Sequence, residues 1–331
     1  MNIESLPAHA PEDAFVYDIP MHHRFRGITH RHGMIWRGPA GWAEWSPFLD
    51  YGPEEIAPWL RAAQEMAEVG FPEPVRTEIP VNVTIPAVSP EVAFHLTATS
   101  GCSTAKVKVA EPGQSLAHDM VRLEAVRQAL PQGAIRVDAN GGWSVDDAET
   151  ALRHLNRVGL EYAEQPCRTV EELAELRRRL RPHGIRIAAD ESIRRADDPL
   201  RVAELEAADI VVLKVQPLGG VRACLAWADR LGLPVVVSSA LETSIGLAAG
   251  VALAASLPTL PYACGLNTSA LFKRDVTDHP LAAVDGVITV RPIEPDPSLL
   301  ETIEATADDQ AFWRDRWEQT AQEEFKLQNL P

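Results

Sequence analysis

The chain has 331 residues, 46% hydrophobic and 24% charged, so it can bury a large core and is not disordered. Its formal net charge of −16 opposes binding to nucleic acid, because such binding requires Lys and Arg to neutralise phosphates. The length exceeds the usual single-domain range and suits one eight-stranded barrel with a small companion domain.

Three features of the sequence bear on the location of the protein. The N-terminal segment MNIESLPAHAPEDAF is acidic and has no apolar core, so it does not resemble a signal peptide. The four cysteines are far apart and predict reduced, buried thiols. The most apolar stretch, 246–257, is too short to span a bilayer and predicts a buried helix. We therefore expect a cytoplasmic protein without a membrane segment.

Residues 1–78 predict a small α+β capping domain. Short β-prone pieces extend to about residue 52, and the turn residues at 38–41 (GPAG) predict a hairpin. Apolar residues then recur at helical spacing over 53–69, after a proline and before Gly70. We expect an antiparallel meander followed by one helix.

Residues 79–270 predict a TIM-like (β/α) barrel, which places the protein in the α/β class. Eight short apolar runs alternate with helix-length segments; the runs are VNVTIPAV, AKVKVA, IRVDAN, LEYAEQP, IRIAADES, DIVVLKVQ, LPVVVSSA and YACGL. The segments 144–159 and 169–184 have acidic first turns and a terminal Gly, as crossover helices should. Residues 271–331 turn Pro-rich and then helical, and we expect them to return to the capping domain.

Charged residues recur near the ends of five of these runs. Lys106 and Lys108 share one face of their strand, because side chains alternate with period two. The later positions follow at intervals of 24 to 30 residues, about one βα unit each; they are Asp138, Glu164, Asp190 and Lys214. Functional groups of such a barrel lie at the carboxyl ends of its strands, so these side chains should converge.

Three converging carboxylates would repel one another unless a cation lies between them. Oxygen ligands favour a hard divalent ion, so we expect Mg²⁺, with Mn²⁺ as a substitute. The charge of the ion and burial would lower the pKa of a neighbouring lysine, which suits it to act as a base. This chemistry is removal of a proton next to a carboxylate of a small-molecule substrate, through an enediolate.

Each residue also has a structural interpretation. A single Asp or Glu at a strand end is more often a helix cap or an ion-pair partner, and Lys106 alone would fit an ion pair lining the barrel. Lys214 in VVLKV carries the most weight, because burying a lysine in an apolar strand is costly without a function or a partner.

Two further segments are polar. The histidines His22, His23, His30 and His32 are spaced irregularly, so we expect solvent exposure or substrate contact rather than a metal site. Ser238 and Ser239 either cap the next helix or hold a second substrate carboxylate, and the sequence favours neither. The motifs GxSxG, the P-loop and a GxGxxG turn are absent.

The ordered motifs KVKV, VDAN, EQP, AADES and VLK resemble those of the enolase superfamily, in particular its muconate-lactonising subgroup. Within it, GWAEWSP, the EQPC form, SSALETSIG and the compact capping domain are most similar to the o-succinylbenzoate synthases. The resemblance implies an enolase-type barrel and a syn dehydration of 2-succinyl-6-hydroxy-2,4-cyclohexadiene-1-carboxylate in menaquinone biosynthesis.

The resemblance also assigns roles. Asp138, Glu164 and Asp190 would bind Mg²⁺; Lys108 would take the proton and return it to the leaving hydroxyl, Lys214 would stabilise charge from the opposite face, and Lys106 would tune its neighbour. The residues expected to contact the substrate are Asn140, Ser238, Ser239, Arg26, Gly27 and Gly265.

Other functions share these residues. An N-succinylamino acid racemase or a dipeptide epimerase would use Lys108 and Lys214 to exchange protons on opposite faces. A barrel that binds a ligand without turnover, or a lyase with Lys214 as a Schiff-base nucleophile, is a different class. The oligomeric state is left open by the sequence.

Overall fold

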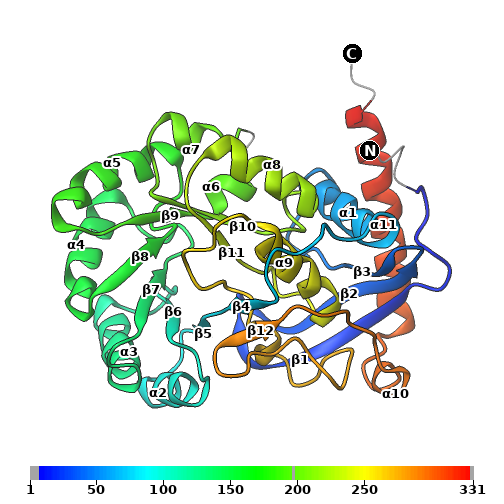
Figure 1. Cartoon of the computed structure of the whole chain (residues 1–331), viewed down its shortest axis with the longest axis horizontal. Helices are drawn as coiled ribbons and strands as arrows, with labels where there is room; N and C mark the ends of the chain where they lie inside the picture. Colours follow the sequence, from blue (N-terminus) through cyan, green and yellow to red (C-terminus); the bar gives the residue numbers. More distant parts are fainter. Residues whose placement is uncertain (1–6, 196–197, 329–331) are drawn as a thin grey trace.

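The barrel is a parallel sheet whose strands follow one another in chain order. The computed structural model describes residues 7–195 and 198–328, in which seven strands pair in the order β11-β10-β9-β8-β7-β6-β5. The predicted runs therefore form a curled sheet, with the connecting helices around its outside (Figure 1). The strands are β5 (Val83–Ile85), β6 (Thr104–Lys108), β7 (Ala134–Asp138), β8 (Leu160–Glu164), β9 (Ile187–Ala189), β10 (Ile210–Leu213) and β11 (Val235–Val237).

The sheet closes at residues 264–265, where the eighth strand was predicted. Cys264 bridges to Val81 before β5, and Gly265 bridges to Ser238 after β11. Backbone hydrogen bonds of 2.7 to 3.1 Å hold this segment on both sides. The predicted strand is thus reduced to two isolated bridges. A Cβ at position 265 would lie 2.5 Å from Ser238 Oγ and 3.2 Å from Ser238 Cβ, so glycine lets the segment pack closely against Ser238.

The barrel interior is largely apolar toward the amino ends of its strands and charged at their carboxyl ends. Residues two or four positions before the strand-end residues share the same inward face and form a buried cluster inside the barrel, made of Tyr162, Ala188, Ile210, Val212 and Val236. The opposite faces of the strands belong to the main core under the helices. This alternation is why Lys106 and Lys108 both point inward, as their spacing predicted.

The crossover helices begin and end at the predicted signals. Ser144 Oγ accepts a hydrogen bond from Asp147 N at 3.2 Å, and Thr169 and Glu172 form a capping box. The predicted apolar helix is α9, which is buried along nearly its whole length. The helices are α2 (Pro90–Thr99), α3 (Leu116–Ala129), α4 (Val145–Leu155), α5 (Val170–Leu180), α6 (Glu191–Arg194), α7 (Arg201–Glu204), α8 (Val221–Leu231) and α9 (Ser244–Ser256).

The N-terminal meander packs beside the barrel. β1 (Phe15–Phe25), β2 (Ile28–Gly38) and β3 (Gly41–Trp45) pair antiparallel, and the predicted hairpin lies where Gly38 pairs with Gly41. The predicted helix follows as α1 (Pro53–Glu68).

The C-terminal segment packs on this meander. α11 (Ala307–Gln328) lies beside α1 (Figure 1), and the Trp317 ring meets Trp36 edge-on at 5.2 Å. Edge-to-face aromatic pairs add to the burial of both rings. The remaining elements are β4 (Glu78–Pro80), which pairs with β12 (Val287–Thr289), and α10 (Pro297–Leu300).

The cysteines are buried free thiols, as predicted. Burial raises the pKa of the Cys167 and Cys264 thiols to about 12, so both stay protonated and unreactive near neutral pH. Within the described residues, no helix combines the length and apolar character that crossing a membrane requires.

Candidate active site

Three of the predicted charged residues lie on one level of the barrel. The register of β6, β7 and β8 pairs Lys108 with Asp138, and Asp138 with Glu164. Asp190 directly follows β9 and Lys214 directly follows β10. Parallel strands place such residues at the same end of the sheet, so the spacing in the sequence becomes proximity in space.

Ion pairs connect these side chains across the barrel. Lys108 Nζ lies 2.6 Å from Asp138 Oδ2, and Lys106 Nζ lies 2.8 Å from Glu164 Oε1 and 3.3 Å from Asp138 Oδ2. Lys214 Nζ lies 2.7 Å from Asp190 Oδ2. These ion pairs form two groups, and hydrogen bonds through Asn140, Glu191 and Arg194 connect the Lys214–Asp190 pair to the other four residues. All six predicted charged residues therefore belong to one network.

Lys108 on β6 and Lys214 after β10 face each other across the barrel. β7, β8 and β9 separate β6 from β10 on one side, and β5, the segment 264–265 and β11 separate them on the other. Lys108 and Lys214 consequently rise from opposite walls of the barrel. A ligand between them would present one face to each amine.

Burial and the opposite charges of neighbouring side chains shift the pKa values of these residues in opposite directions. Burial lowers the pKa of Lys106, but Glu164 and Asp138 outweigh it and raise that pKa above its ordinary value. Burial raises the pKa of Glu164 to about 7, because the attraction of Lys106 does not offset burial together with the nearby carboxylates. For Asp138, burial is outweighed by Lys108 and Lys106, which lower its pKa. Without a metal ion, the carboxylates therefore hold Lys106 protonated.

The donor atoms are of the type that a hard divalent cation takes, although those of Asp138, Glu164 and Asp190 do not all lie within 4.8 Å of one another. Glu164 Oε2 is buried and has no hydrogen-bond partner, although a buried carboxylate oxygen without a partner is costly. Asp138, Glu164 and Asp190 offer only oxygen ligands, which is the set that Mg²⁺ prefers. The side chains of all three are at most 2% exposed, so their charges are poorly screened by water.

A cavity of about 260 Å³ opens above the network. It is lined by ten of the residues that the sequence singled out: Lys106, Lys108, Asp138, Asn140, Lys214, Arg26, Gly27, Ser238, Ser239 and Gly265. Glu164 and Asp190 do not line it and lie buried behind the lysines. The cavity therefore offers its amines to a ligand and keeps two carboxylates underneath.

The two serines line the cavity and do not cap the following helix. The N-cap of α9 is Thr243, whose side chain accepts a hydrogen bond from Ile245 N. Ser239 Oγ lies 2.5 Å from Thr268 Oγ1, and Ser238 Oγ donates to Gly265 O at 3.4 Å. The capping interpretation of Ser238 and Ser239 is therefore wrong.

The capping domain contributes one edge of the cavity through the turn between β1 and β2. Arg26 Nη2 donates to Tyr51 Oη at 2.7 Å, and its guanidinium lies 3.8 Å from the Phe48 ring centroid. Arg26 has a φ of +49° and precedes Gly27 at +79°, so the tip of the hairpin is left-handed. This geometry directs Arg26 toward the barrel.

Some residues at the site were missed by the sequence analysis because they act on the backbone or from a loop. Gln165 Oε1 accepts hydrogen bonds from the backbone N–H groups of Asp190 and Ser192, at 2.9 and 3.1 Å. Arg194 Nε lies 3.1 Å from Asp190 Oδ1 and Arg194 Nη1 donates to Tyr51 Oη. The spacing of four between Asp190 and Arg194 on a helical turn could have revealed this pair.

A buried carboxylate joins the capping domain to the loop after β11. Glu44 of β3 accepts hydrogen bonds from Tyr17 Oη at 2.8 Å, Ser46 Oγ at 2.7 Å and Gly246 N at 2.9 Å. It also accepts from Thr243 at the start of α9. The loop that lines the cavity at Ser239 and Leu241 is therefore held from the capping side.

A second buried carboxylate beside it makes stability depend on pH. Burial and the charge of Glu44 raise the pKa of Glu242 from 4.5 to about 7. The folded chain thus holds a proton there that the unfolded chain releases between these values. The free energy of unfolding should fall as pH rises through this window, by about 3 kcal/mol from this group.

Glu242→Gln should remove the part of this pH dependence that Glu242 contributes, and the part from Glu164, whose pKa is also raised to about 7, should remain. The variant is expected to gain stability over the natural chain as the pH rises from about 5 to 8, as measured by urea unfolding at several pH values. Glu301→Gln, at an exposed position, is the matched control. Parallel pH profiles for Glu242→Gln and the natural chain would show that Glu242 stays ionised on folding.

Comparisons with known proteins agree with this geometry. Residues 16–67 match the model described as "Enolase N-terminal domain-like", and residues 91–295 match "Enolase C-terminal domain-like". The chain is 59% identical to the o-succinylbenzoate synthase of Thermobifida fusca, over 93% of this chain and 98% of that protein. It is 52% identical to that of Mycolicibacterium smegmatis, over 92% and 94%.

Solved structures show the same fold at lower identity. A muconate lactonizing enzyme from Pseudomonas fluorescens superposes with a TM-score of 0.75 at 20% identity, covering 90% of this chain and 100% of that one. An N-succinyl Arg/Lys racemase from Bacillus cereus gives 0.73 at 20% identity, covering 88% and 97%. The chain belongs to the enolase superfamily and, within it, to the family of the o-succinylbenzoate synthases.

Proposed function

We propose that the protein is an o-succinylbenzoate synthase, a hydro-lyase that removes water from 2-succinyl-6-hydroxy-2,4-cyclohexadiene-1-carboxylate to form 2-succinylbenzoate in menaquinone biosynthesis. The observation that carries the proposal is the pair of amines on opposite walls of one cavity, Lys108 and Lys214, above three buried carboxylates. The 59% identity with a synthase of this name supports the choice of substrate.

Lys108 acts as base and then as acid. It lines the cavity with a side chain that is only 15% exposed, so water competes little for the substrate proton. In a syn elimination, the proton and the hydroxyl leave from the same face of the ring, so one amine on one wall can serve both steps. Lys108 takes the proton next to the ring carboxylate and then gives it to the departing hydroxyl.

Lys214 and Lys106 act through charge. Lys214 lies across the cavity from Lys108, where its ammonium stabilises the negative charge that develops on the opposite face of the enediolate. Lys106 lies behind Lys108 on the same strand and contacts Asp138, the carboxylate that Lys108 also contacts. Lys106 thereby sets how strongly Asp138 attracts the catalytic amine.

Asp138, Glu164 and Asp190 would hold one Mg²⁺, and Mn²⁺ would substitute for it because both ions take oxygen ligands. The charge of the bound ion would acidify the substrate C–H by stabilising the carboxylate as it becomes an enediolate. Asn140 supports this arrangement: its Oδ1 accepts a hydrogen bond from Lys108 Nζ at 2.6 Å and its Nδ2 donates to Glu191 Oε1.

The succinyl carboxylate requires a second polar site. Ser238, Ser239 and Gly265 line the wall between β11 and β5, and Arg26 and Gly27 line the edge from the capping domain. Hydroxyls and a guanidinium are suitable donors to a carboxylate, whereas the backbone N–H groups of Ser238, Ser239 and Gly265 already donate within the barrel wall. These residues would orient the substrate so that its ring lies between the two lysines.

Turnover is tested by ultraviolet absorbance, which changes as the ring becomes aromatic. The natural chain should convert the substrate with Mg²⁺, lose activity in EDTA, and regain it with Mg²⁺ or Mn²⁺. Absence of conversion by folded, Mg²⁺-loaded protein would contradict the proposal.

A second function is favoured by the same opposed lysines, because a racemase needs one base on each face. N-succinylamino acid racemisation, or epimerisation of a dipeptide, would exchange the substrate α-proton with solvent deuterium without loss of water. Such exchange, in the absence of dehydration, would support this alternative. Both functions act on a small-molecule carboxylate.

We also propose a cytoplasmic location and domain boundaries near residues 78 and 270. Four buried free thiols are typical of a reducing compartment, which supports the location. The boundaries are supported by the change from antiparallel meander to parallel strands, since β4 and β12 pair with each other outside the barrel sheet. Limited proteolysis followed by mass spectrometry would test the boundaries.

A further inference from the structure

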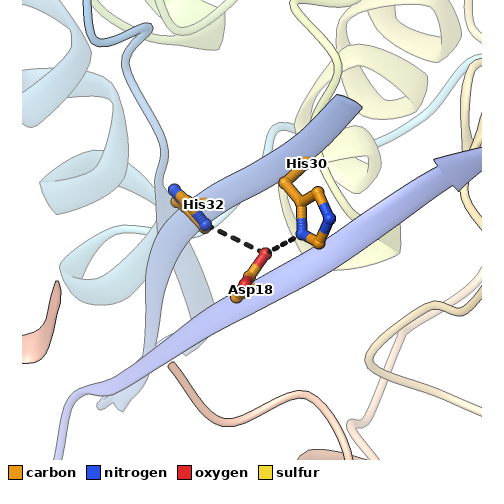
Figure 2. A group of neighbouring side chains, drawn as sticks. All are labelled: Asp18, His30 and His32. Carbon is orange, nitrogen blue, oxygen red and sulfur yellow. Dashed lines mark hydrogen bonds and ion pairs between the residues drawn. The ribbon is translucent and has the colours of Figure 1, made fainter. Parts of the chain in front are cut away.

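We propose a second metal site, for a transition-metal dication such as Zn²⁺, formed by Asp18, His30 and His32 on the capping sheet (Figure 2). β1 and β2 pair antiparallel, with Asp18 opposite His32 and Pro20 opposite His30. Directly opposed residues point to the same face of a sheet, as do residues two positions apart. The three side chains therefore rise together from one face of the hairpin.

The ligand atoms converge on one point. His30 Nδ1 lies 2.7 Å from Asp18 Oδ1, and His32 Nε2 lies 2.9 Å from the same oxygen (Figure 2). Among the residues that the structure describes, Asp18, His30 and His32 are the one group of three His, Cys, Asp or Glu residues whose ligand atoms all lie within 4.8 Å of one another. Two imidazole nitrogens and a carboxylate oxygen thus meet without any rearrangement of the backbone.

The donor set selects the kind of metal. Imidazole nitrogen suits Zn²⁺ and its neighbours in the first transition row, whereas Mg²⁺ prefers oxygen ligands only. Ligand atoms around a tetrahedral Zn²⁺ are about 3.3 Å apart, so each imidazole must retreat from Asp18 by about half an ångström. Rotation of the side chains provides this, and water completes the coordination because His30 is 50% exposed.

The surroundings leave the site accessible. A separate cavity of about 290 Å³ is lined by His30 and His32 together with Arg26 and Gly27, although Asp18 does not line it. A cation can reach the histidines from solvent there. Arg26 and Gly27 also line the cavity above the lysines. A metal at Asp18 would therefore link β1 and β2, the two strands that carry the turn at Arg26 and Gly27.

The spacing of these histidines in the sequence favoured exposure or substrate contact, because spacing relates the histidines only to one another. The third ligand, Asp18, lies on the preceding strand and becomes a neighbour through pairing of β1 with β2. His22 and His23 of the same segment are not part of the group. The competing interpretation is that both imidazoles simply donate hydrogen bonds to Asp18.

Zn²⁺ titration of the Mg²⁺-loaded protein by calorimetry distinguishes the two interpretations. With Mg²⁺ in excess to occupy the barrel, the natural chain should bind one Zn²⁺ that His32→Ala and Asp18→Asn bind at least about tenfold more weakly. His22→Ala, from the same hairpin, should bind like the natural chain. Co²⁺ in place of Zn²⁺ should give a visible absorption band that His32→Ala lacks.

Stability supplies a second readout. Zn²⁺ should raise the melting temperature of the natural chain and of His22→Ala but leave that of His32→Ala unchanged, because a ligand that binds only the folded state stabilises it. Any Zn²⁺ that enters the barrel would act equally on all variants and would show as loss of dehydration activity. Equal stoichiometry and affinity for the natural chain and His32→Ala would overturn the proposal.

Discussion

Lys108→Ala is expected to lower kcat for dehydration by at least about 10³-fold, because the amine serves as base and then as acid in one turnover. No other described amine lies on that wall within the cavity except Lys106, which Glu164 and Asp138 hold by ion pairs. The measurement is the ultraviolet assay at saturating substrate and Mg²⁺. The affinity for Mg²⁺ should change little, since the carboxylates remain.

Lys273→Ala is the matched control, because Lys273 is an exposed lysine outside the cavity. It should keep the full rate and the melting temperature of the natural chain. Lys108→Ala should also melt near the natural chain, since Lys106 still neutralises Asp138. A Lys108→Ala variant that turns over at more than a tenth of the natural rate would exclude Lys108 as the base.

Glu164→Gln is expected to abolish Mg²⁺-dependent turnover, again by about 10³-fold or more. The substitution keeps the size of the side chain but replaces an anionic oxygen ligand with an amide, which a hard dication binds far less well. It also removes the partner that lies 2.8 Å from the buried Lys106 amine, but Asp138 remains at 3.3 Å and the cost of burying the Glu164 charge is removed too, so the free energy of unfolding should change little near neutral pH. Calorimetric titration with Mg²⁺ and urea unfolding measure the two effects separately.

Glu111→Gln is the control for this variant. Glu111 lines the same cavity and is exposed, so the substitution removes one negative charge from the region without touching the buried network. Its affinity for Mg²⁺ should stay within about twofold of the natural value, since exposed charges are screened. If Glu164→Gln binds Mg²⁺ as tightly as Glu111→Gln does, Glu164 is not a ligand of the ion.

The charged network could be predicted because it follows from two periodicities. Alternation along a strand places Lys106 and Lys108 on one face, and the length of a βα unit brings Asp138 and Glu164 to the same level. Both are properties of regular backbone and can be counted in the sequence. The barrel and its crossover helices were predicted for the same reason.

Contacts made by loops, or between residues of different strands that meet only after the strands pair, could not be counted in this way. Gln165 supports the site through backbone N–H groups, and Tyr51 through Arg194 and Arg26 on two different elements. Asp18 joins His30 and His32 only once β1 and β2 have paired. The eighth strand was overestimated, because an apolar run does not reveal that the segment pairs with its neighbours only through two isolated bridges.

The closure of the barrel at residues 264–265 has a consequence for motion. Two isolated bridges hold this segment, whereas β6 and β7 pair over five residues, so fewer backbone contacts hold the closure than hold the strands that carry Lys108 and Asp138. We therefore expect the wall that carries Ser238 and Gly265 to move more readily than Lys106, Lys108 and Asp138 on β6 and β7. This difference in movement would let the pocket change its width for different acyl chains and leave the proton-transfer geometry intact.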